Sequence, residues 1–254
     1  MSRFRPTPAT RYVHPKAVSL LEQEGAHDAD LDISGENAPN YLSWVASLCE
    51  PHLGHKVLEV GAGLGAITAR YQQGREVVAN DVSPACLSAL HERFDGYPNV
   101  RVEDWDLRTL ELEERFDSIV MVNVLEHIAD DVGALQGLSR LLVPGGRLIV
   151  YVPALNGLYG PLDKKVGHYR RYSVWRLGQV FEEAGLDPVE LRWMNTLAIP
   201  AWAAFGRGDV NDAQRSSKLL GLWDRTAVPA GRFVESRVRM PIGLNVFGVG
   251  RPRG

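Results

Sequence analysis

The sequence predicts an α/β protein built on an open, doubly wound sheet. From Lys56 to Val152, short apolar runs of strand length alternate with segments of helical pattern, as is typical of parallel strands joined by crossover helices. The first of these strands runs directly into three glycines at alternate positions, Gly61, Gly63 and Gly65. Glycine suits a tight strand-to-helix turn on which a ligand lies against bare backbone. We therefore expect a ligand site at the carboxyl ends of the strands, where open α/β sheets bind their ligands.

Length, composition and charge are those of an ordinary soluble globular protein. The 254 residues suffice for one α/β domain with additions, and 45% apolar with 23% charged residues is a folded rather than a disordered composition. A net charge of -3 provides no general attraction to nucleic acid or anionic membranes. No apolar run approaches the ~20 residues of a membrane span, and the first residues lack the apolar stretch of a signal peptide, so we expect a cytoplasmic location. Cys49 and Cys86 are too few for a disulfide framework and lack metal-site spacing.

The predicted organisation is an N-terminal arm or cap at residues 1–39 and a main domain at residues 40–254. The arm is proline-rich at first and then acidic. Two segments of the domain, 153–172 and 194–241, interrupt the strand–helix alternation. We expect both to cap the substrate, the second as irregular helices, because it is too short and irregular for a core of its own.

Each element has its own signal in the sequence. The first helix is predicted over Asn40–Leu48, where four apolar side chains share one helical face, and it ends at Pro51. The predicted strands are Val57–Val60, Glu76–Ala79, Val100–Glu103, Ser118–Val122, Arg147–Val152, Val189–Trp193 and Leu244–Val249. The later helices are predicted to begin after Gly65, at Ser83-Pro84, at Asp130 or Asp131, and at Ser173, the last two ending at Pro144-Gly145-Gly146 and at Gly185.

The glycine turn fits two cofactors. Residues 61–66 also satisfy the looser dinucleotide pattern G-x-G-x-x-G/A, and Asp81 stands 20 residues after Gly61 as a ribose acid. Three features favour S-adenosylmethionine over a nicotinamide dinucleotide. Glu59 can bind an ammonium group, which a pyrophosphate lacks, and Asp106 follows the third strand, where an adenine amino group needs an acceptor. The tyrosines after the fifth strand also form no Tyr-x-x-x-Lys pair to relay a proton for hydride transfer, because Tyr159, Tyr169 and Tyr172 are followed at that spacing by Asp163, Ser173 and Arg176.

Four motifs together resemble the class I S-adenosylmethionine-dependent methyltransferases: V-L-E-V-G-A-G-L-G, A-N-D-V-S, N-V-L-E-H-I and L-V-P-G-G-R-L. The resemblance covers roughly residues 40–190 and implies a Rossmann-like sheet of seven strands, mostly parallel with an antiparallel last strand, plus helical caps. It places Glu59 near the methionine amine, Asp81 on the ribose and Asp106, in preference to Asp104, on the adenine. The cofactor-binding residues predicted with it are Tyr41, Glu59, Gly61, Gly63, Gly65, Asp81, Val82, Asp106, Leu107 and Asn123. Helix packing is the alternative for Tyr41.

The segment G-H-Y-R-R-Y-S, Gly167 to Ser173, resembles a subgroup of bacterial small-molecule methyltransferases. It follows the fifth strand and, with the lysines before it, places four cations within eight residues of a net negative chain. We expect it to bind an anionic or strongly polar substrate group, with a solvated basic turn as the alternative. The predicted substrate-binding residues are Lys164, His168, Tyr169, Arg170, Arg171, Tyr172, Trp202 and Trp223.

Methyl transfer from a sulfonium depends mainly on positioning and desolvation, but an oxygen or nitrogen nucleophile also needs a base. The predicted catalytic candidates are His127, His168, Tyr169 and Glu126, with a purely structural histidine as the alternative for His127. No metal is expected, because no carboxylate–histidine cluster shows clear ligand spacing in the sequence.

The leading hypothesis is an enzyme that methylates a small molecule, natural-product or sugar-like, with S-adenosyl-L-methionine. The alternatives are a C-methyltransferase acting on a prenyl diphosphate-type alkene, an NAD-dependent oxidoreductase, and a non-catalytic cofactor-binding module. Nucleic acid is not an expected partner, because no basic stripe with interleaved aromatic residues lies outside residues 164–176. The sequence leaves a monomer and a homodimer equally open.

Overall fold

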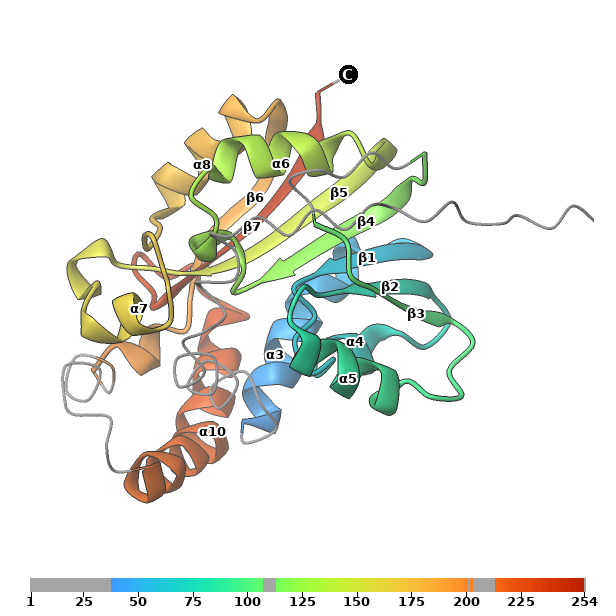
Figure 1. Ribbon diagram of the computed structural model, residues 1–254. Helices are drawn as coiled ribbons and strands as arrows, with labels where there is room; N and C mark the ends of the chain where they lie inside the picture. The colour runs from blue at the N-terminus through green and yellow to red at the C-terminus, as the bar shows by residue number, and fades with distance from the viewer. Residues whose placement is uncertain (1–37, 107–112, 201, 203–212, 254) are drawn as a thin grey trace, which may run out of the picture.

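The structure, a computed structural model, describes residues 38–106, 113–200, 202 and 213–253. Seven strands form one sheet in the order β3-β2-β1-β4-β5-β7-β6 (Figure 1). Their bounds are β1 Lys56–Val60, β2 Glu76–Asn80, β3 Val100–Glu103, β4 Phe116–Val122, β5 Leu142–Pro153, β6 Leu186–Met194 and β7 Asn245–Pro252. Strands β1 to β5 pair in parallel, whereas β7 is antiparallel to both β5 and β6. The predicted fold class, including the antiparallel last strand, is confirmed.

The strand order also fixes where a ligand can bind. The chain runs outward from β1 to β2 and β3, then returns to the other side of β1 to form β4. Between β1 and β4 the connections diverge to opposite sides, which leaves a crevice beyond the carboxyl ends of these strands. The glycine turn after β1 and the N-V-L-E-H-I segment after β4 therefore meet at one edge of the sheet.

Helices cover both faces of the sheet (Figure 1). The helices are α3 Pro39–Cys49, α4 Thr68–Tyr71, α5 Pro84–Arg93, α6 Asp131–Ser139, α7 Pro161–Lys165, α8 Val174–Glu183 and α10 Ala213–Glu235, and the 3-10 turns are η1 Glu50–His52, η2 Leu125–His127, η3 Asn156–Leu158 and η4 Thr196–Ala198. Successive strand residues point to opposite faces, so Leu58 joins the apolar core beneath α6 and α8 while Val57 joins the core beneath α3 and α10. Burial on both faces explains the continuous apolar runs of the strand sequences.

Several predicted boundaries need correction. Strand β5 starts at Leu142, so Pro144-Gly145-Gly146 lies inside a strand and does not end a helix; α6 already ends at Ser139. The register shifts between Phe116 and Ser118 at this point, and Gly145 has a φ of 82°, so the three residues form an irregularity of the pairing. The helix after the glycine turn is a single turn, Thr68–Tyr71, and Pro51 lies within η1, beyond the end of α3.

The predicted helix starts have different outcomes. Ser173 caps α8 by accepting from the backbone N–H of Arg176 at 3.1 Å, and Asp130, the first of two candidates, caps α6 by accepting from Gly133 at 2.9 Å. Ser83 precedes α5 but its side chain makes no cap hydrogen bond. Its backbone N–H instead donates to Asp81 at 2.9 Å.

Helix α10 corrects the expectation of irregular helices in residues 194–241, because it continues over 23 residues. Two buried carboxylates fix it to the rest of the domain. Asp224 accepts from the backbone N–H of Asn40, at 3.1 Å, and of Tyr41, at 2.8 Å, and so binds the start of α3. Glu235 accepts from the backbone N–H groups of Asn195 and Thr196. Within the described part of the chain, no helix combines the length and the hydropathy of a membrane span.

Candidate active site

The three glycines after β1 adopt left-handed backbone conformations, with φ values of 66°, 56° and 74° at Gly61, Gly63 and Gly65. They differ in what surrounds them. A Cβ at Gly61 would lie 2.4 Å from the side chain of Val124, and one at Gly65 would lie 2.6 Å from Phe94, whereas one at Gly63 would meet nothing within 4 Å. Two glycines therefore permit close packing, and Gly63 presents bare backbone to an open space in which a ligand can lie.

Asp81, at the end of β2, is bonded to the glycine turn. Its Oδ2 accepts from the backbone N–H of Gly63 at 2.8 Å and its Oδ1 from that of Ser83 at 2.9 Å. A carboxylate oxygen has two lone pairs, so each keeps capacity for a ribose hydroxyl. The side chain of Val82 next to it is exposed. The structure thus brings Gly63, Asp81 and Val82 together, as the sequence predicted.

Glu59 lies beneath the turn with 2% of its surface exposed. Its Oε2 accepts from the hydroxyl groups of Tyr71, at 2.6 Å, and Thr68. Burial raises the pKa of the Glu59 carboxyl to about 7, although these hydrogen bonds lower it. A cation placed beside Glu59 would favour its ionised form. Sequence reasoning missed Thr68 and Tyr71, whose only signal is their spacing of three residues on the one helical turn after the glycines.

The side predicted for the adenine is ordered by Asn80. Its side chain donates to the carbonyl of Trp105 at 3.2 Å and accepts from the backbone N–H of Trp105 at 2.7 Å. This pair holds the end of β2 against the segment that follows β3. Asp106 in that segment is partly buried and Asp104 is exposed; the choice of Asp106 for the adenine stays a prediction. Leu107 lies outside the described residues.

Two further cofactor candidates, Asn123 and Tyr41, both contact Tyr151 of β5. Asn123 directly follows β4, has a φ of 54° and donates its backbone N–H to the carbonyl of Tyr151 at 2.8 Å. Tyr41 is buried, with its hydroxyl 3.2 Å from that of Tyr151 and its ring 5.3 Å from that of Trp223. Burial raises the pKa of Tyr41 to about 12. These contacts give Tyr41 a packing role, whereas Asn123 stands at the strand end where the resemblance expects it.

The G-H-Y-R-R-Y segment is bonded to buried acids rather than extended into solvent. Arg171 is 5% exposed; its Nε donates to Asp163 at 2.8 Å and its Nη1 to the carbonyl of Ala154 at 3.2 Å. Burial alone would raise the pKa of Asp163, but hydrogen bonds from His168 and Arg171 outweigh it and lower that pKa. An ion pair this deep leaves no charge of Arg171 available to a substrate, which corrects the picture of four available cations.

Arg170 and Tyr172 converge on a second buried acid, Asp131. Nη1 of Arg170 lies 2.8 Å from Asp131 Oδ2, its Nη2 donates to the carbonyl of Ala129 at 2.6 Å, and the Tyr172 hydroxyl donates to the same Asp131 oxygen at 3.0 Å. Tyr172 is buried, but the Arg170 side chain keeps 25% of its surface exposed. Sequence reasoning missed both acids, because neither their spacing nor their neighbours mark them as partners of this segment.

The remaining substrate candidates lie around these pairs. Lys164 is exposed on α7, and the Tyr169 side chain is 51% exposed. The ring of Trp202 lies 4.7 Å from the Arg171 guanidinium, while Trp223 packs against Tyr41. Both tryptophans therefore adjoin the segments that flank the crevice.

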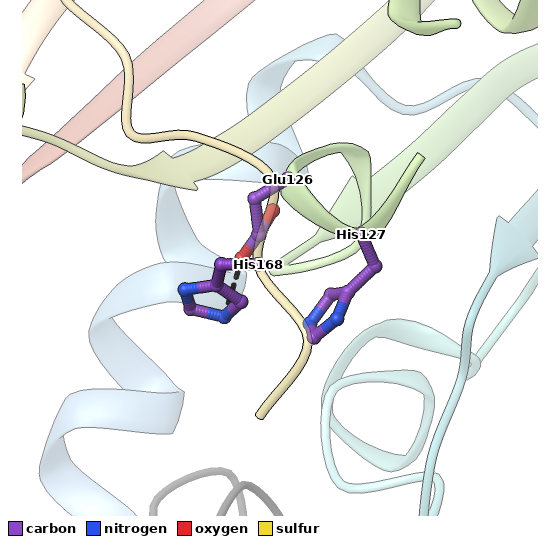
Figure 2. A group of neighbouring side chains, drawn as sticks. All are labelled: Glu126, His127 and His168. Carbon is purple, nitrogen blue, oxygen red and sulfur yellow. Dashed lines mark ion pairs between the residues drawn. The ribbon is translucent and has the colours of Figure 1, made fainter. Parts of the chain in front are cut away.

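Three of the four predicted catalytic candidates meet in space (Figure 2). One ligand atom each from Glu126, His127 and His168 lies within 4.8 Å of the others, and the two imidazole rings meet edge to face at a centroid distance of 4.6 Å. Glu126 is fully buried, and His168 donates its Nδ1–H to Asp163 Oδ1 at 2.9 Å. Tyr169 is not part of this cluster, since only its backbone N–H reaches it, by donating to the Glu126 carbonyl at 2.8 Å.

Comparisons with known proteins agree with this geometry. Residues 58–148 match the family model described as a methyltransferase domain. The chain is 28% identical over 229 residues to an uncharacterised 37.1 kDa protein in transposon TN4556 of Streptomyces fradiae, which covers 85% of this chain and 63% of that protein. It is 37% identical over 101 residues to the demethylmenaquinone methyltransferase of Tropheryma whipplei (strain Twist), which covers 38% of this chain and 41% of that protein. The chain thus spans 41% to 63% of the length of these relatives.

A solved structure shares the fold over nearly the whole chain. The 1,6-didemethyltoxoflavin-N1-methyltransferase of Burkholderia thailandensis, with 1,6-didemethyltoxoflavin and S-adenosylhomocysteine bound, superposes with a TM-score of 0.60 at 19% identity and covers 97% of this chain and 94% of that one. Residues 58–148 therefore match a methyltransferase domain, and they lie within a sheet that has the Rossmann-like fold of this solved methyltransferase.

Proposed function

We propose that the protein transfers a methyl group from S-adenosyl-L-methionine to a small-molecule acceptor. The observation that carries the proposal is the open backbone at Gly63, bonded to the buried carboxylate of Asp81 at 2.8 Å. This unit offers a surface for the ribose and methionine parts of the donor and two acceptor oxygens for ribose hydroxyls. It supports a nucleoside ligand with vicinal hydroxyls.

Glu59 favours the methyl donor over a dinucleotide. A carboxyl group whose pKa is about 7 is only partly ionised at neutral pH, and a neighbouring cation stabilises its ionised form. S-adenosylmethionine supplies an ammonium group on its methionine part. A pyrophosphate would instead add negative charge near Glu59 and Asp81, so the NAD-dependent oxidoreductase is not favoured.

The acceptor is expected to lie beside Glu126, His127 and His168, because these side chains follow β4 and β5 at the same edge of the sheet as the glycine turn. A cluster of imidazoles suits an acceptor whose nucleophile carries a proton. His127 is half-buried and is the more accessible candidate base, while Asp163 orients the ring of His168. We therefore favour a hydroxyl or another protic nucleophile over an alkene.

The reaction needs the nucleophilic atom of the acceptor, the methyl carbon and the sulfur of the donor to lie in line. A lone pair of the acceptor attacks the methyl carbon, the sulfur–carbon bond breaks, and its electron pair stays on sulfur to give S-adenosylhomocysteine. The acceptor's proton passes to an imidazole nitrogen. Fixed near-attack geometry can account for ~7–11 kcal/mol of the barrier, so positioning by the turn and the G-H-Y-R-R-Y segment carries most of the rate.

The polar group of the acceptor remains a proposal of its own. Lys164, Lys165 and Arg170 are all reached by solvent, and of these we propose that Lys164 and Arg170 bind an anionic or strongly polar substituent. The subgroup resemblance of residues 167–173 and a natural-product or sugar-like acceptor belong to the same proposal.

The experiment is transfer of a labelled methyl group from S-adenosylmethionine to a panel of hydroxylated and carboxylated metabolites. We expect label on at least one acceptor and roughly ten- to a hundred-fold less transfer at low donor concentration with Asp81→Ala, because the ribose loses a charged acceptor. Asp95→Ala, at an exposed aspartate away from the turn, is the matched control. Transfer that survives unchanged in Asp81→Ala would contradict the assignment of the donor site.

A further inference from the structure

The cluster of Glu126, His127 and His168 is assembled from two segments of the chain. Glu126 and His127 belong to η2 after β4, and His168 lies between α7 and α8. Figure 2 shows the three side chains converging, with one carboxylate oxygen and two imidazole nitrogens all within 4.8 Å of one another. Two histidines and one carboxylate are a donor set that binds divalent transition metals in proteins.

His168 has the environment of an oriented metal ligand. Its Nδ1 lies 2.9 Å from Asp163 Oδ1, so that the carboxylate fixes the ring and directs Nε2 toward Glu126. The His168 side chain is only 10% exposed, and its buried Nε2 has no hydrogen-bond partner among the described residues; the nearest acid oxygen, Glu126 Oε1, is 3.9 Å away. A carboxylate bonded to the far nitrogen of a histidine is the usual outer support of a metal-binding imidazole.

The charges around the cluster also favour a cation. Asp163 is matched by the buried guanidinium of Arg171, at 2.8 Å, and Arg170 is matched by Asp131. Both arginines are thus bonded to acids outside the cluster, and Glu126 contributes one carboxylate of the cluster to a bound cation.

We propose that Glu126, His127 and His168 form a binding site for one divalent transition-metal ion of the Zn²⁺ or Fe²⁺ class. Mg²⁺ and Ca²⁺ do not fit, because they prefer oxygen ligands throughout. Ligand atoms on a tetrahedral Zn²⁺ are about 3.3 Å apart, given metal–nitrogen bonds of about 2.0–2.1 Å. The 3.9 Å between His168 Nε2 and Glu126 Oε1 is close to this spacing. A ligand atom of His127 lies within 4.8 Å of one atom of each of the other two residues.

Three protein ligands leave a coordination position open, as catalytic metal sites do. Resting here on the proposed function, we infer that this position takes the hydroxyl oxygen of the methyl acceptor. With the ion bound, His127 and His168 would be ligands and the ion would replace the imidazole base of the proposed function by lowering the pKa of that hydroxyl. The proton would then leave to solvent, the oxygen would attack the methyl carbon, and the sulfur–carbon bond would break with its electrons kept by sulfur. The acceptor class is then a hydroxylated small molecule.

Metal binding is tested on the full chain, freed of any histidine tag and dialysed against a chelator. Calorimetric titration with Zn²⁺, and visible absorption with Co²⁺ as a spectroscopic probe, should each give one equivalent per chain. His127→Gln and His168→Gln should lose this equivalent. His91→Gln, at an exposed histidine of α5, is the matched control and should retain it. Asp163→Asn should weaken Zn²⁺ binding roughly 10- to 100-fold, as loss of an outer support does.

Glu126→Gln, nearly the same size and unable to carry the charge, provides a second test if a histidine variant fails to fold. The proposal is overturned if the wild-type chain takes up no stoichiometric Zn²⁺, or if the double variant His127→Gln/His168→Gln binds it as the wild type does. A parallel titration with S-adenosylhomocysteine separates the two proposals. Binding of S-adenosylhomocysteine without Zn²⁺ refutes only the metal site, whereas Zn²⁺ binding without S-adenosylhomocysteine refutes the proposed function and leaves the metal site standing.

Discussion

The two sides of the crevice are built by different means. On the side proposed for the methyl donor (the donor side), backbone N–H groups hold the glycine turn, as in the hydrogen bond from Gly63 to Asp81. On the side proposed for the methyl acceptor (the acceptor side), ion pairs with buried acids hold the G-H-Y-R-R-Y segment: Arg171 pairs with Asp163 and Arg170 with Asp131. The donor side can therefore keep its shape with few fixed side chains. The acceptor side depends on buried charges, so a mutation there that leaves a fully buried charge without its partner should have the largest effect on stability.

The largest expected effect is that of Asp163→Ala. Without this carboxylate, Arg171 becomes an unpaired buried cation and His168 loses the partner of its Nδ1. Removal of one partner from a buried pair costs ~3–5 kcal/mol, and urea unfolding should show that loss. Asp95→Ala, at an exposed position, should change the free energy of unfolding by less than about 0.5 kcal/mol. If Asp163→Ala lowers the free energy of unfolding by less than about 1 kcal/mol, the acceptor side does not depend on buried ion pairs and the contrast between the two sides is wrong.

A pair of glycine variants sharpens the contrast from the donor side. Gly61→Ala forces a Cβ to 2.4 Å from Val124 at a φ of 66°, so it should destabilise the fold by ~1–3 kcal/mol. Gly63→Ala meets open space and should cost only about 1 kcal/mol of backbone strain. The added methyl would nevertheless occupy the surface proposed for the donor. Thermal unfolding and S-adenosylhomocysteine titration of both variants should show Gly61→Ala as the less stable and Gly63→Ala as the weaker binder; equal stability losses would contradict the different surroundings of the two glycines.

Because of Glu59, both the free energy of unfolding and the affinity for S-adenosylhomocysteine should depend on pH. The Glu59 pKa rises from 4.5 to about 7 on folding, so between these values the folded state binds more protons than the unfolded one, and stability falls as pH rises from about 4.5 to 7. The Glu59→Gln variant cannot titrate, so its unfolding free energy relative to wild type should rise over this window and level off above pH about 7. Donor binding should favour the ionised carboxylate, so affinity for S-adenosylhomocysteine should increase with pH through about 7 in wild type. A pH-independent affinity would mean that no ammonium group lies beside Glu59.

The smallest effect on stability is expected for Arg170→Ala. The arginine is one-quarter exposed, and its ion pair with Asp131 is supported by the Tyr172 hydroxyl, so the loss should be about 1 kcal/mol. If Arg170 also binds the methyl acceptor, the KM of the variant for that acceptor should rise, while its affinity for S-adenosylhomocysteine and its Tm change little. An unchanged KM on the true acceptor would leave Arg170 as a purely structural residue.

The sequence predicted the fold around the glycine turn well because the strand, the three glycines and the acids at successive strand ends are all read from local spacing. The sheet order confirmed the strands, while the binding of a cofactor by the glycines and acids stays a prediction. The sequence predicted the acceptor side poorly because the partners of Arg170 and Arg171 are single aspartates, Asp131 and Asp163, without a motif of their own. Pro144-Gly145-Gly146 was wrongly predicted to end a helix for another reason. Proline and glycine are typical both of helix ends and of irregular strand pairing, and here they mark irregular pairing.

The His–Glu cluster shows the same limit. Its members are far apart in the chain, so the spacing gave no reason to expect a metal, and only the fold brings His168 beside Glu126 and His127. Helix α10 was expected to be irregular, yet Asp224 and Glu235 bond to α3 and to the segment after β6 and keep it continuous. Tertiary contacts of this kind are absent from any local pattern.

The central claim is that the glycine turn and Asp81 bind S-adenosylmethionine, and calorimetric titration tests it most directly. Wild-type protein titrated with S-adenosylhomocysteine should show one site per chain, and Asp81→Ala should bind roughly ten- to a hundred-fold more weakly. The Tm of the variant should also fall, because the N–H groups of Gly63 and Ser83 lose their acceptor, so binding is compared at a temperature at which both proteins are folded. Titration with NAD under the same conditions should show no binding. If NAD binds and S-adenosylhomocysteine does not, the protein is no methyltransferase and the donor site has been assigned to the wrong cofactor.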